Sequence, residues 1–383
     1  DFVETGTEQN SEWEWEQWFE VSMKPLLSRM ALAPTDGNHD DTPNLNYTYH
    51  FNTDKTFNET ATVKPQFDGI TYSFVYGDAL FMVYSHQDFW RGSYSYANGT
   101  STYLSNDVAN WFRDQVEKYP DTKWRIAAVH KNLFTGSGHQ TDEDGALFRA
   151  TLLPVFQELN IDFVIQGHDH IYEVMGPINN TTKTIVPGSV TNVELVSPDS
   201  NKNPKGQQGG TFNVKDGTLY FVNGTCGRKR YYPYTQDEME AGFDKHKVEG
   251  YWDLFTGKYG QPGAPAFSEI SVSSSEIEVN TYTSDANAQA TLFDTFKIVK
   301  SGNTGIEENK QSAKLYPTYA KDKINTTESD IIQVNAIDLT GKIYTLPFDN
   351  QHIDVSNLTD GIYVVQIFTN EKTRSERIVK TSR

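Results

Sequence analysis

The feature that most constrains this chain is a set of short apolar runs, each of which ends abruptly in metal-binding side chains. Trp124–Val129 and Ile161–Ile165 have the length and apolarity of buried strands, and they lead into His130 and the string Gly167–His170. A similar string, Gly37–Asp40, follows a short extended stretch. Open α/β sheets place their sites beyond the carboxyl ends of strands, so we expect these side chains to meet at one sheet edge.

Strands, loops and helices alternate over the first part of the chain, which predicts a layered α/β fold. Ser11 and Glu14 form a capping-box pattern ahead of apolar residues at helical spacing, so a first helix is expected there. Tyr72–Tyr76 and Leu80–Ser85 are predicted to be two strands joined by a tight turn. The other predicted helices of this region are 108–116 and 146–159.

Two polar segments, 41–70 and 176–265, are expected to be loop-rich, and the second could form rims over the site around a strand at Leu219–Val222. Beyond them, Phe267–Val279 and Thr291–Val299 alternate like antiparallel strands and are expected to extend the sheet. Residues 1–300 are therefore predicted to form one catalytic domain.

The pattern of residues changes after 301–311, a segment with the composition of a linker. Residues 312–383 contain short β-type runs separated by Gly, Asp and Asn turns, which predicts a small all-β sandwich.

Composition narrows the classes of function. The net charge of −18 argues against a broad basic surface, so no nucleic-acid partner is expected. Cys226 is the single cysteine, which excludes an intrachain disulfide and makes sulfur ligation of a metal a poor hypothesis. No apolar stretch approaches the roughly 20 residues of a transmembrane helix.

Asn38, His130, His168 and His170 supply an amide oxygen and imidazole nitrogens, ligands that suit zinc, iron, manganese or cobalt. Alternate residues of a tight loop, such as His168 and His170, can project toward one ion or toward two neighbouring ions. Two ions about 3.5–4 Å apart can clamp the attacking and leaving oxygens of a phosphoester and acidify a bridging water. Such a centre needs a bridging carboxylate, for which Asp1 is the candidate.

Other polar and aromatic side chains have simpler interpretations. A lone histidine after a strand is usually structural, and only the combination of the strings with His130 favours a metal site. His139, in a flexible Gly-rich loop, is a candidate for contacting substrate, although an exposed loop histidine explains it equally well. We assign Trp13, Trp15 and Trp18 to the core and a helix surface, and Cys226 to the core. The acidic residues Asp142, Glu143 and Asp144 are assigned to a solvated helix start. The basic residues Arg228, Lys229 and Arg230 are assigned to a surface run.

Over about residues 1–300 the sequence resembles the calcineurin-like metallophosphoesterases, especially the branch close to purple acid phosphatases. Asp1-Phe2-Val3-Glu4 resembles the end of the family's Gly-Asp-x-x motif, and Asn38-His39 its Gly-Asn-His-Asp/Glu motif. His130 matches the lone-histidine motif, and His168 with His170 matches Gly-His-x-His. The resemblance implies a layered metallophosphoesterase β-sandwich flanked by helices.

The resemblance also implies roles for these residues. Asp1 would bridge two metal ions, Fe, Zn or Mn; the set Asn38, His130 and His168 would bind one ion, and His170 the other. His39 would contact phosphate and act as general acid or charge stabiliser toward the leaving alkoxide, and Asp40 would orient His39.

Two departures from the family pattern matter. The family's first Asp-x-His motif precedes the position of Asp1, so we expect the first strand and further metal ligands upstream, and the fragment 1–383 to be inactive without them. Purple acid phosphatases have a tyrosine three residues after the bridging aspartate, where this chain has Glu4, so no tyrosinate–iron chromophore is expected.

Residues 312–383 resemble the sorting domain of type IX secretion. The matching pieces are Leu315-Tyr316-Pro317, Asp338–Lys342, Val355–Leu358, Gly361-Ile362-Tyr363 and the basic end Arg377–Lys380. This resemblance implies export by the type IX machinery to the medium or the outer-membrane surface of a Gram-negative bacterium. An ordinary β-sandwich binding module, for example for carbohydrate, is the alternative.

The sequence as a whole predicts a secreted or cell-surface metallophosphoesterase acting on small phosphoesters, with phosphomonoesters favoured. The alternatives left open are an ectonucleotidase or phosphodiesterase, and a non-catalytic surface-binding protein with a residual metal site.

Overall fold

The computed structural model of the chain describes residues 1–6, 11–40, 46–53, 70–85, 102–140, 142–193, 208–235, 237–238, 255–300, 319–326, 330–338, 342–349, 351–370 and 373–382. The chain divides into two compact units, Asp1–Asn303 and Thr304–Arg383. The predicted linker 301–311 lies outside the described residues.

The helices all belong to the first unit. They are α1 (Glu12–Glu16), the π-helix η1 (Gln17–Met23), α2 (Lys24–Leu27), α3 (Asn46–His50), α5 (Thr102–Lys118) and α6 (Glu143–Glu158). The strands of this unit are β1 (Tyr72–Tyr76), β2 (Ala79–Val83), β3 (Trp124–Val129), β4 (Phe163–Gln166), β5 (Tyr172–Asn179), β6 (Thr184–Ile185), β7 (Val190–Thr191), β8 (Gln208–Asn213), β9 (Thr218–Asn223), β10 (Phe255–Gly260), β11 (Ala266–Val272), β12 (Glu276–Ser284) and β13 (Ala290–Val299).

The larger sheet has the order β1-β2-β3-β4-β9-β5-β10, with β6 paired to β5. Its centre, β2-β3-β4-β9, is parallel, and both outer sides are antiparallel. The carboxyl ends of β3, β4 and β9 therefore lie next to one another at one edge of the sheet. The second sheet has the order β11-β12-β13-β8-β7.

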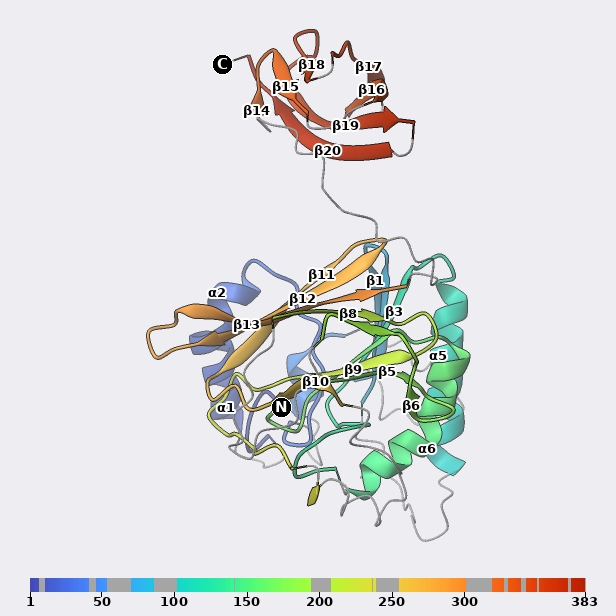
Figure 1. The fold of residues 1–383 in the computed structure, drawn as a ribbon. Helices are drawn as coiled ribbons and strands as arrows, with labels where there is room; N and C mark the ends of the chain where they lie inside the picture. Colours follow the sequence, from blue (N-terminus) through green and yellow to red (C-terminus); the bar gives the residue numbers. More distant parts are fainter. Residues whose placement is uncertain are drawn as a thin grey trace. The chain divides into compact units, whose positions relative to one another are not determined.

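Alternating side chains of the large sheet face two separate cores. Leu80, Ala127 and Val164 lie on the face covered by α5 and α6, together with Phe112 and Phe156 of those helices (Figure 1). The neighbouring residues of the same strands, such as Ile126 and Phe163, pack on the second sheet through side chains such as Val279, Phe296 and Ile298. Helices, large sheet and small sheet thus form three layers, which confirms the predicted layered α/β sandwich with flanking helices.

The second unit is all-β, as predicted. Its strands are β14 (Tyr319–Ala320), β15 (Lys323–Asn325), β16 (Ile331–Asp338), β17 (Ile343–Thr345), β18 (His352–Asp354), β19 (Gly361–Thr369) and β20 (Thr373–Lys380). A sheet of order β14-β20-β19-β16-β17 and the pair β15-β18 enclose a core that includes Val334, Val365 and Ile353. Of the sequence pieces that resemble a sorting domain, Leu315-Tyr316-Pro317 and the turn residues 339–341 lie outside the described residues.

Local prediction failed where long-range contacts decide the structure. The first helix is interrupted by the π-helix η1, and Ser11 makes no side-chain cap, because Glu14 instead accepts hydrogen bonds from the amides of Glu4 and Thr5 at 3.0 and 2.8 Å. The predicted loop 41–70 contains α3, and its residues 41–45 and 54–69 lie outside the described part.

Two further predictions were wrong in detail. The segment predicted to be loop-rich around a strand at Leu219–Val222, 176–265, contains that strand as β9. It also contains half of β5 together with β6, β7, β8 and β10, because β8 pairs with β13 and β10 with β5, partners far along the chain. The predicted strand Phe267–Val279 is two strands, β11 and β12, since Ser273 closes a turn by donating to the Glu276 carbonyl at 2.9 Å.

Candidate metal centre

The strand order brings the predicted ligands together. His130 follows β3, His168 follows β4, and the segment Gly224–Lys229 follows β9, so three adjacent parallel strands deliver side chains to one edge. The amide of Gly167 donates to the His130 carbonyl at 2.8 Å, which continues the β3–β4 pairing into the site.

The first residues of the chain are held against the loop 37–40. The buried Asp40 carboxylate accepts hydrogen bonds from the amides of Phe2 at 2.6 Å, Val3 at 3.1 Å and Gly37 at 2.7 Å. A Cβ atom at Gly37 would overlap the Asp1 carboxylate, so a glycine is needed there for this close approach. Asp40 thereby keeps Asp1 beside the loop that carries Asn38 and His39.

Metal-binding atoms from four segments converge on the His130 imidazole. Its Nε2 atom lies 3.2 Å from Asp1 Oδ2, 3.1 Å from Asn38 Oδ1 and 3.2 Å from His168 Nδ1. A single nitrogen cannot satisfy three partners by hydrogen bonding, since it carries at most one proton. Burial, and then nearby positive groups such as Lys131, lower the pKa of His130 well below its usual value, which favours the neutral imidazole that binds metals.

The donor chemistry around His130 suits a metal ion. Ligands about 2.0–2.1 Å from a tetrahedral ion lie about 3.3 Å from one another. The spacings of 3.1–3.2 Å between His130 Nε2 and each of its three neighbours are close to that value. The ligand atoms of Asp1, His130 and His168 do not all lie within 4.8 Å of one another, so these three side chains would have to move closer together to hold one ion.

The backbone at His168 is in the left-handed region, with φ of 64°. A non-glycine residue rarely adopts this conformation, and such strain persists where the surrounding structure enforces it, often at functional sites. The neighbouring Gly167 has little space, because a Cβ atom there would lie 3.1 Å from His130 Nδ1. The Gly167–His168 turn thus keeps the imidazoles of His130 and His168 close to each other.

His170 lies apart from the His130 cluster and is held by the segment after β9. Its Nδ1 donates to the Lys229 carbonyl at 2.8 Å, which leaves Nε2 as the atom able to bind a metal. The Tyr231 ring stacks on His170 with centroids 4.6 Å apart, and Gln261 Nε2 donates to the carbonyls of both residues. Burial and then the charge of Lys229 lower the pKa of His170.

The His39 side chain is oriented by the backbone of the first segment. Its Nδ1 donates to the Glu4 carbonyl at 2.7 Å, and its amide donates to Asp1 Oδ1 at 2.9 Å. The hydrogen bonds that the Asp40 carboxylate accepts come from the backbone amides of Phe2, Val3 and Gly37. His39 Nε2 is thereby left as the ring atom that can exchange a proton with a bound molecule.

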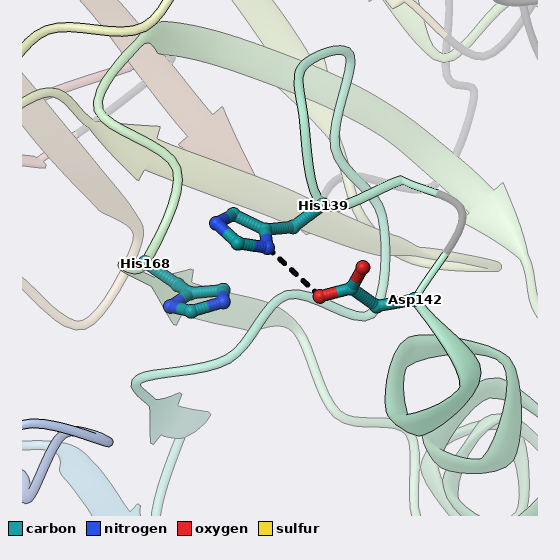
Figure 2. A group of neighbouring side chains, drawn as sticks. All are labelled: His139, Asp142 and His168. Carbon is teal, nitrogen blue, oxygen red and sulfur yellow. Dashed lines mark hydrogen bonds and ion pairs between the residues drawn. The ribbon is translucent and has the colours of Figure 1, made fainter.

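His139 forms a second cluster with Asp142 and His168 (Figure 2). Its Nδ1 lies 2.8 Å from Asp142 Oδ2, and its ring covers that of His168 with centroids 3.8 Å apart. Burial lowers the pKa of His139, but the hydrogen bond to Asp142 and the charge of Asp169 outweigh it and raise the pKa. Sequence reasoning missed Asp142, which it assigned to a solvated helix start; the His-x-x-Asp spacing was the available signal.

Two buried carboxyl groups lie behind the histidine loop. Asp169 accepts a hydrogen bond from the Thr135 hydroxyl, and Glu173 accepts one from the Gly136 amide at 2.9 Å. Burial raises the pKa of Asp169 to about 6 and that of Glu173 well above its usual value. These contacts connect the His168–His170 loop to the segment that leads to His139.

The candidate ligands line a pocket of about 970 Å³. Phe2, Trp18 and Met23 supply an apolar part of its wall, and Arg228 and Lys229 a basic part. Cys226 also lines the pocket and is exposed, so its assignment to the core was wrong.

Two other sequence interpretations change at this pocket. Arg228 and Lys229 are part of the pocket wall rather than only a surface run, because they follow β9 beside β4. Of the tryptophans, Trp15 is fully buried and Trp13 is exposed, as expected, whereas Trp18 reaches the pocket. The position of a strand in the sheet, which decides this, has no local signal in the sequence.

Comparison with known proteins agrees with this arrangement. Residues 1–172 match the calcineurin-like phosphoesterase family, and residues 314–381 match the secretion system C-terminal sorting domain. An uncharacterized protein of Mycobacterium tuberculosis is 25% identical over 186 residues, which are 45% of this chain and 34% of that protein. Purple acid phosphatase 5 of Arabidopsis thaliana is 31% identical over 87 residues, 22% of each chain.

Among solved structures, the purple acid phosphatase isolated from yellow lupin (Lupinus luteus) seeds aligns with 61% of this chain and 33% of its own, at a TM-score of 0.37 and 15% identity. This chain thus spans a third or less of the length of these relatives.

Residues 1–172 therefore match the calcineurin-like phosphoesterase family, with purple acid phosphatases among the similar proteins, and a match to a type IX sorting domain follows in the chain. The family implies a dinuclear metal centre and metal-dependent hydrolysis of phosphoesters, and the sorting domain indicates secretion or display at the cell surface. No helix of the described residues is long and apolar enough to cross a membrane.

Proposed function

We propose that this protein is an exported phosphomonoesterase of a Gram-negative bacterium, which uses two metal ions to hydrolyse small phosphoesters. The observation that carries the proposal is the convergence of Asp1, Asn38 and His168 on His130 Nε2 at 3.1–3.2 Å. When bound, iron, zinc or manganese would lower the pKa of a water molecule and neutralise charge on the phosphoryl oxygens.

Asp1, Asn38, His130 and His168 would hold one metal ion, and His170, with Asp1 shared, would hold the other. The Lys229 carbonyl supports this assignment, because it fixes His170 Nδ1 as the protonated nitrogen and turns Nε2 into a ligand. Upstream residues would complete the second ligand set, as the family resemblance implies.

His39 would donate a proton from Nε2 to the leaving alkoxide, since its Nδ1 is engaged by the Glu4 carbonyl. Asp40 would act through the backbone, by holding Asp1 and the 37–40 loop in register. His139, whose Nδ1 is hydrogen-bonded to the Asp142 carboxylate, would also contact the phosphate. The phosphomonoester preference rests on the relatedness to purple acid phosphatases.

The test is hydrolysis of p-nitrophenyl phosphate by the chain extended through the residues that precede Asp1 in its gene, loaded with manganese, zinc or iron. His39→Ala should lower kcat by about 10²–10⁴-fold and leave the metal content unchanged. His130→Ala should lose metal as well as activity, and His352→Ala, in the other unit, should change neither.

Absence of turnover with p-nitrophenyl phosphate, bis-p-nitrophenyl phosphate and ATP in the metal-loaded protein would refute the proposal and favour a binding protein with an inherited metal site. Faster turnover of bis-p-nitrophenyl phosphate or ATP than of the monoester would instead identify a phosphodiesterase or an ectonucleotidase.

A further inference from the structure

The segment that follows β9 is built into the candidate metal centre through its backbone. The Lys229 carbonyl accepts from His170 Nδ1 at 2.8 Å, and the Tyr231 ring stacks on His170 with an interplanar angle of 9°. Gln261 Nε2 donates to the carbonyls of His170 and Tyr231 at 2.6 and 2.8 Å. The backbone of this segment is thus held beside His170, which places Arg228 and Lys229 at the edge of the pocket.

This segment brings two cations to the pocket. Arg228 and Lys229 both line it, and neither has an acidic partner among the ion pairs of the described residues. The Lys229 ammonium lies 5.6 Å from the centroid of the Tyr231 ring, which braces it without neutralising it. In a chain of net charge −18, two adjacent cations without counter-ions at the active-site edge are an anion-binding feature.

The acidic residues of the pocket belong to another wall. Asp1 and Glu4 come from the first segment, and the Asp1 carboxylate is already engaged by His130 and by the His39 amide. The scissile phosphoryl group would be bound by the metal ions and His39. The cations after β9 are therefore left for a different anionic group of the same molecule.

We infer that Arg228 and Lys229 form a subsite for a second phosphate group, so that the preferred substrates are phosphomonoesters that carry a second, separate phosphate. This inference rests on the proposed function, because it assigns the scissile phosphate to the metal centre. Arg228 would grip the second phosphate through its guanidinium fork, and Lys229 would supply a point charge. Both side chains are specificity-determining residues that take no part in bond breaking.

Binding of non-hydrolysable ligands to the metal-loaded full chain tests the inference without turnover. The dissociation constants of methylphosphonate, methylenediphosphonate and a propane-bridged diphosphonate are measured by calorimetry at fixed ionic strength. The variants are Arg228→Gln, Lys229→Gln and the double variant. The matched control is Lys215→Gln, an exposed lysine in the turn before β9. Lys229→Gln keeps the carbonyl that holds His170, and metal content is measured in parallel because diphosphonates can chelate metals.

The double variant should lose about tenfold or more of the preference for a diphosphonate over methylphosphonate, while methylphosphonate binding and metal content stay as in the wild type. The control should keep the full preference. Loss for the propane-bridged ligand would support substrates with two separated phosphates, and loss for methylenediphosphonate alone would overturn this substrate class in favour of phosphoanhydrides.

A preference that is unchanged in the double variant, with methylphosphonate still bound, would overturn the inference and leave the proposed function standing. Failure of the metal-loaded wild type to bind methylphosphonate at all would overturn the proposed function itself. The two failures are thus separated by different ligands.

Discussion

A buried ion pair joins the two sheets directly beneath the histidine loop and makes a sharp stability prediction. Lys258 Nζ lies 2.5 Å from Asp294 Oδ1, both side chains are fully buried, and the Tyr172 hydroxyl donates to the other oxygen of Asp294. Burial raises the pKa of Asp294 and lowers that of Lys258, so the charged forms depend on the contact between the two side chains. Tyr172 begins β5, two residues after His170.

Removing one member of the pair should cost far more than removing both. Asp294→Leu leaves a buried ammonium without its carboxylate, which costs about 3–5 kcal/mol. Lys258→Met should cost less, because the remaining carboxyl group can take up a proton. The double variant should lie within about 1 kcal/mol of the wild type, since replacing a whole buried pair by apolar side chains is close to neutral.

Urea unfolding followed by tryptophan fluorescence measures this effect. All seven tryptophans lie in the unit Asp1–Asn303, so the signal reports on that unit in the intact chain. A coupling free energy of about 3 kcal/mol is expected from the double-mutant cycle. Additive effects of the two substitutions, to within about 0.5 kcal/mol, would refute the argument that the pair is held by mutual contact.

Three further predictions concern the site and the pH response. Gly167→Ala should lower metal content, because the new Cβ would lie 3.1 Å from His130 Nδ1; unchanged metal content by mass spectrometry would contradict this. Trp18→Ala should raise KM for aryl phosphates with little change in kcat, because Trp18 lines the pocket but carries no proton to transfer; equal loss of kcat would contradict it. Burial raises the pKa of Asp162 to about 6, so the folded state binds more protons than the unfolded state between about pH 4 and 6, and stability falls as pH rises through that window. Asp162→Asn should therefore gain up to about 3 kcal/mol relative to the wild type between pH 4 and 7 in urea unfolding, and parallel pH profiles would exclude this.

Much of the fold could be predicted because local patterns encode the elements. The run Trp124–Val129 is a strand over those same residues, and the turn at Gly77-Asp78 joins two strands as expected. Apolar spacing also placed α5 and α6. In these elements the length of the apolar run or the spacing of its apolar residues distinguishes a strand from a helix, and both are local properties of the sequence.

The predicted ligand residues lie close together in the structure because each of them follows the end of a strand that the sequence predicts. His130 and His168 lie 38 residues apart in the chain, yet their nitrogens lie 3.2 Å apart. The sequence identified these residue types and their order, and the parallel pairing of β3 with β4 brought them together. Their roles as ligands remain proposals.

The sequence by itself determined which elements form and which side chains carry metal and phosphoester chemistry, since periodicity and residue type are local properties. Only the tertiary structure decided which strand ends are neighbours. Because β9 pairs with β4, Arg228 and Lys229 line the pocket, and Cys226 is exposed there as well. The fold of residues 135–140 likewise places the His139 ring beside that of His168. Such juxtapositions depend on contacts between residues far apart in the chain, and no window of the sequence records them.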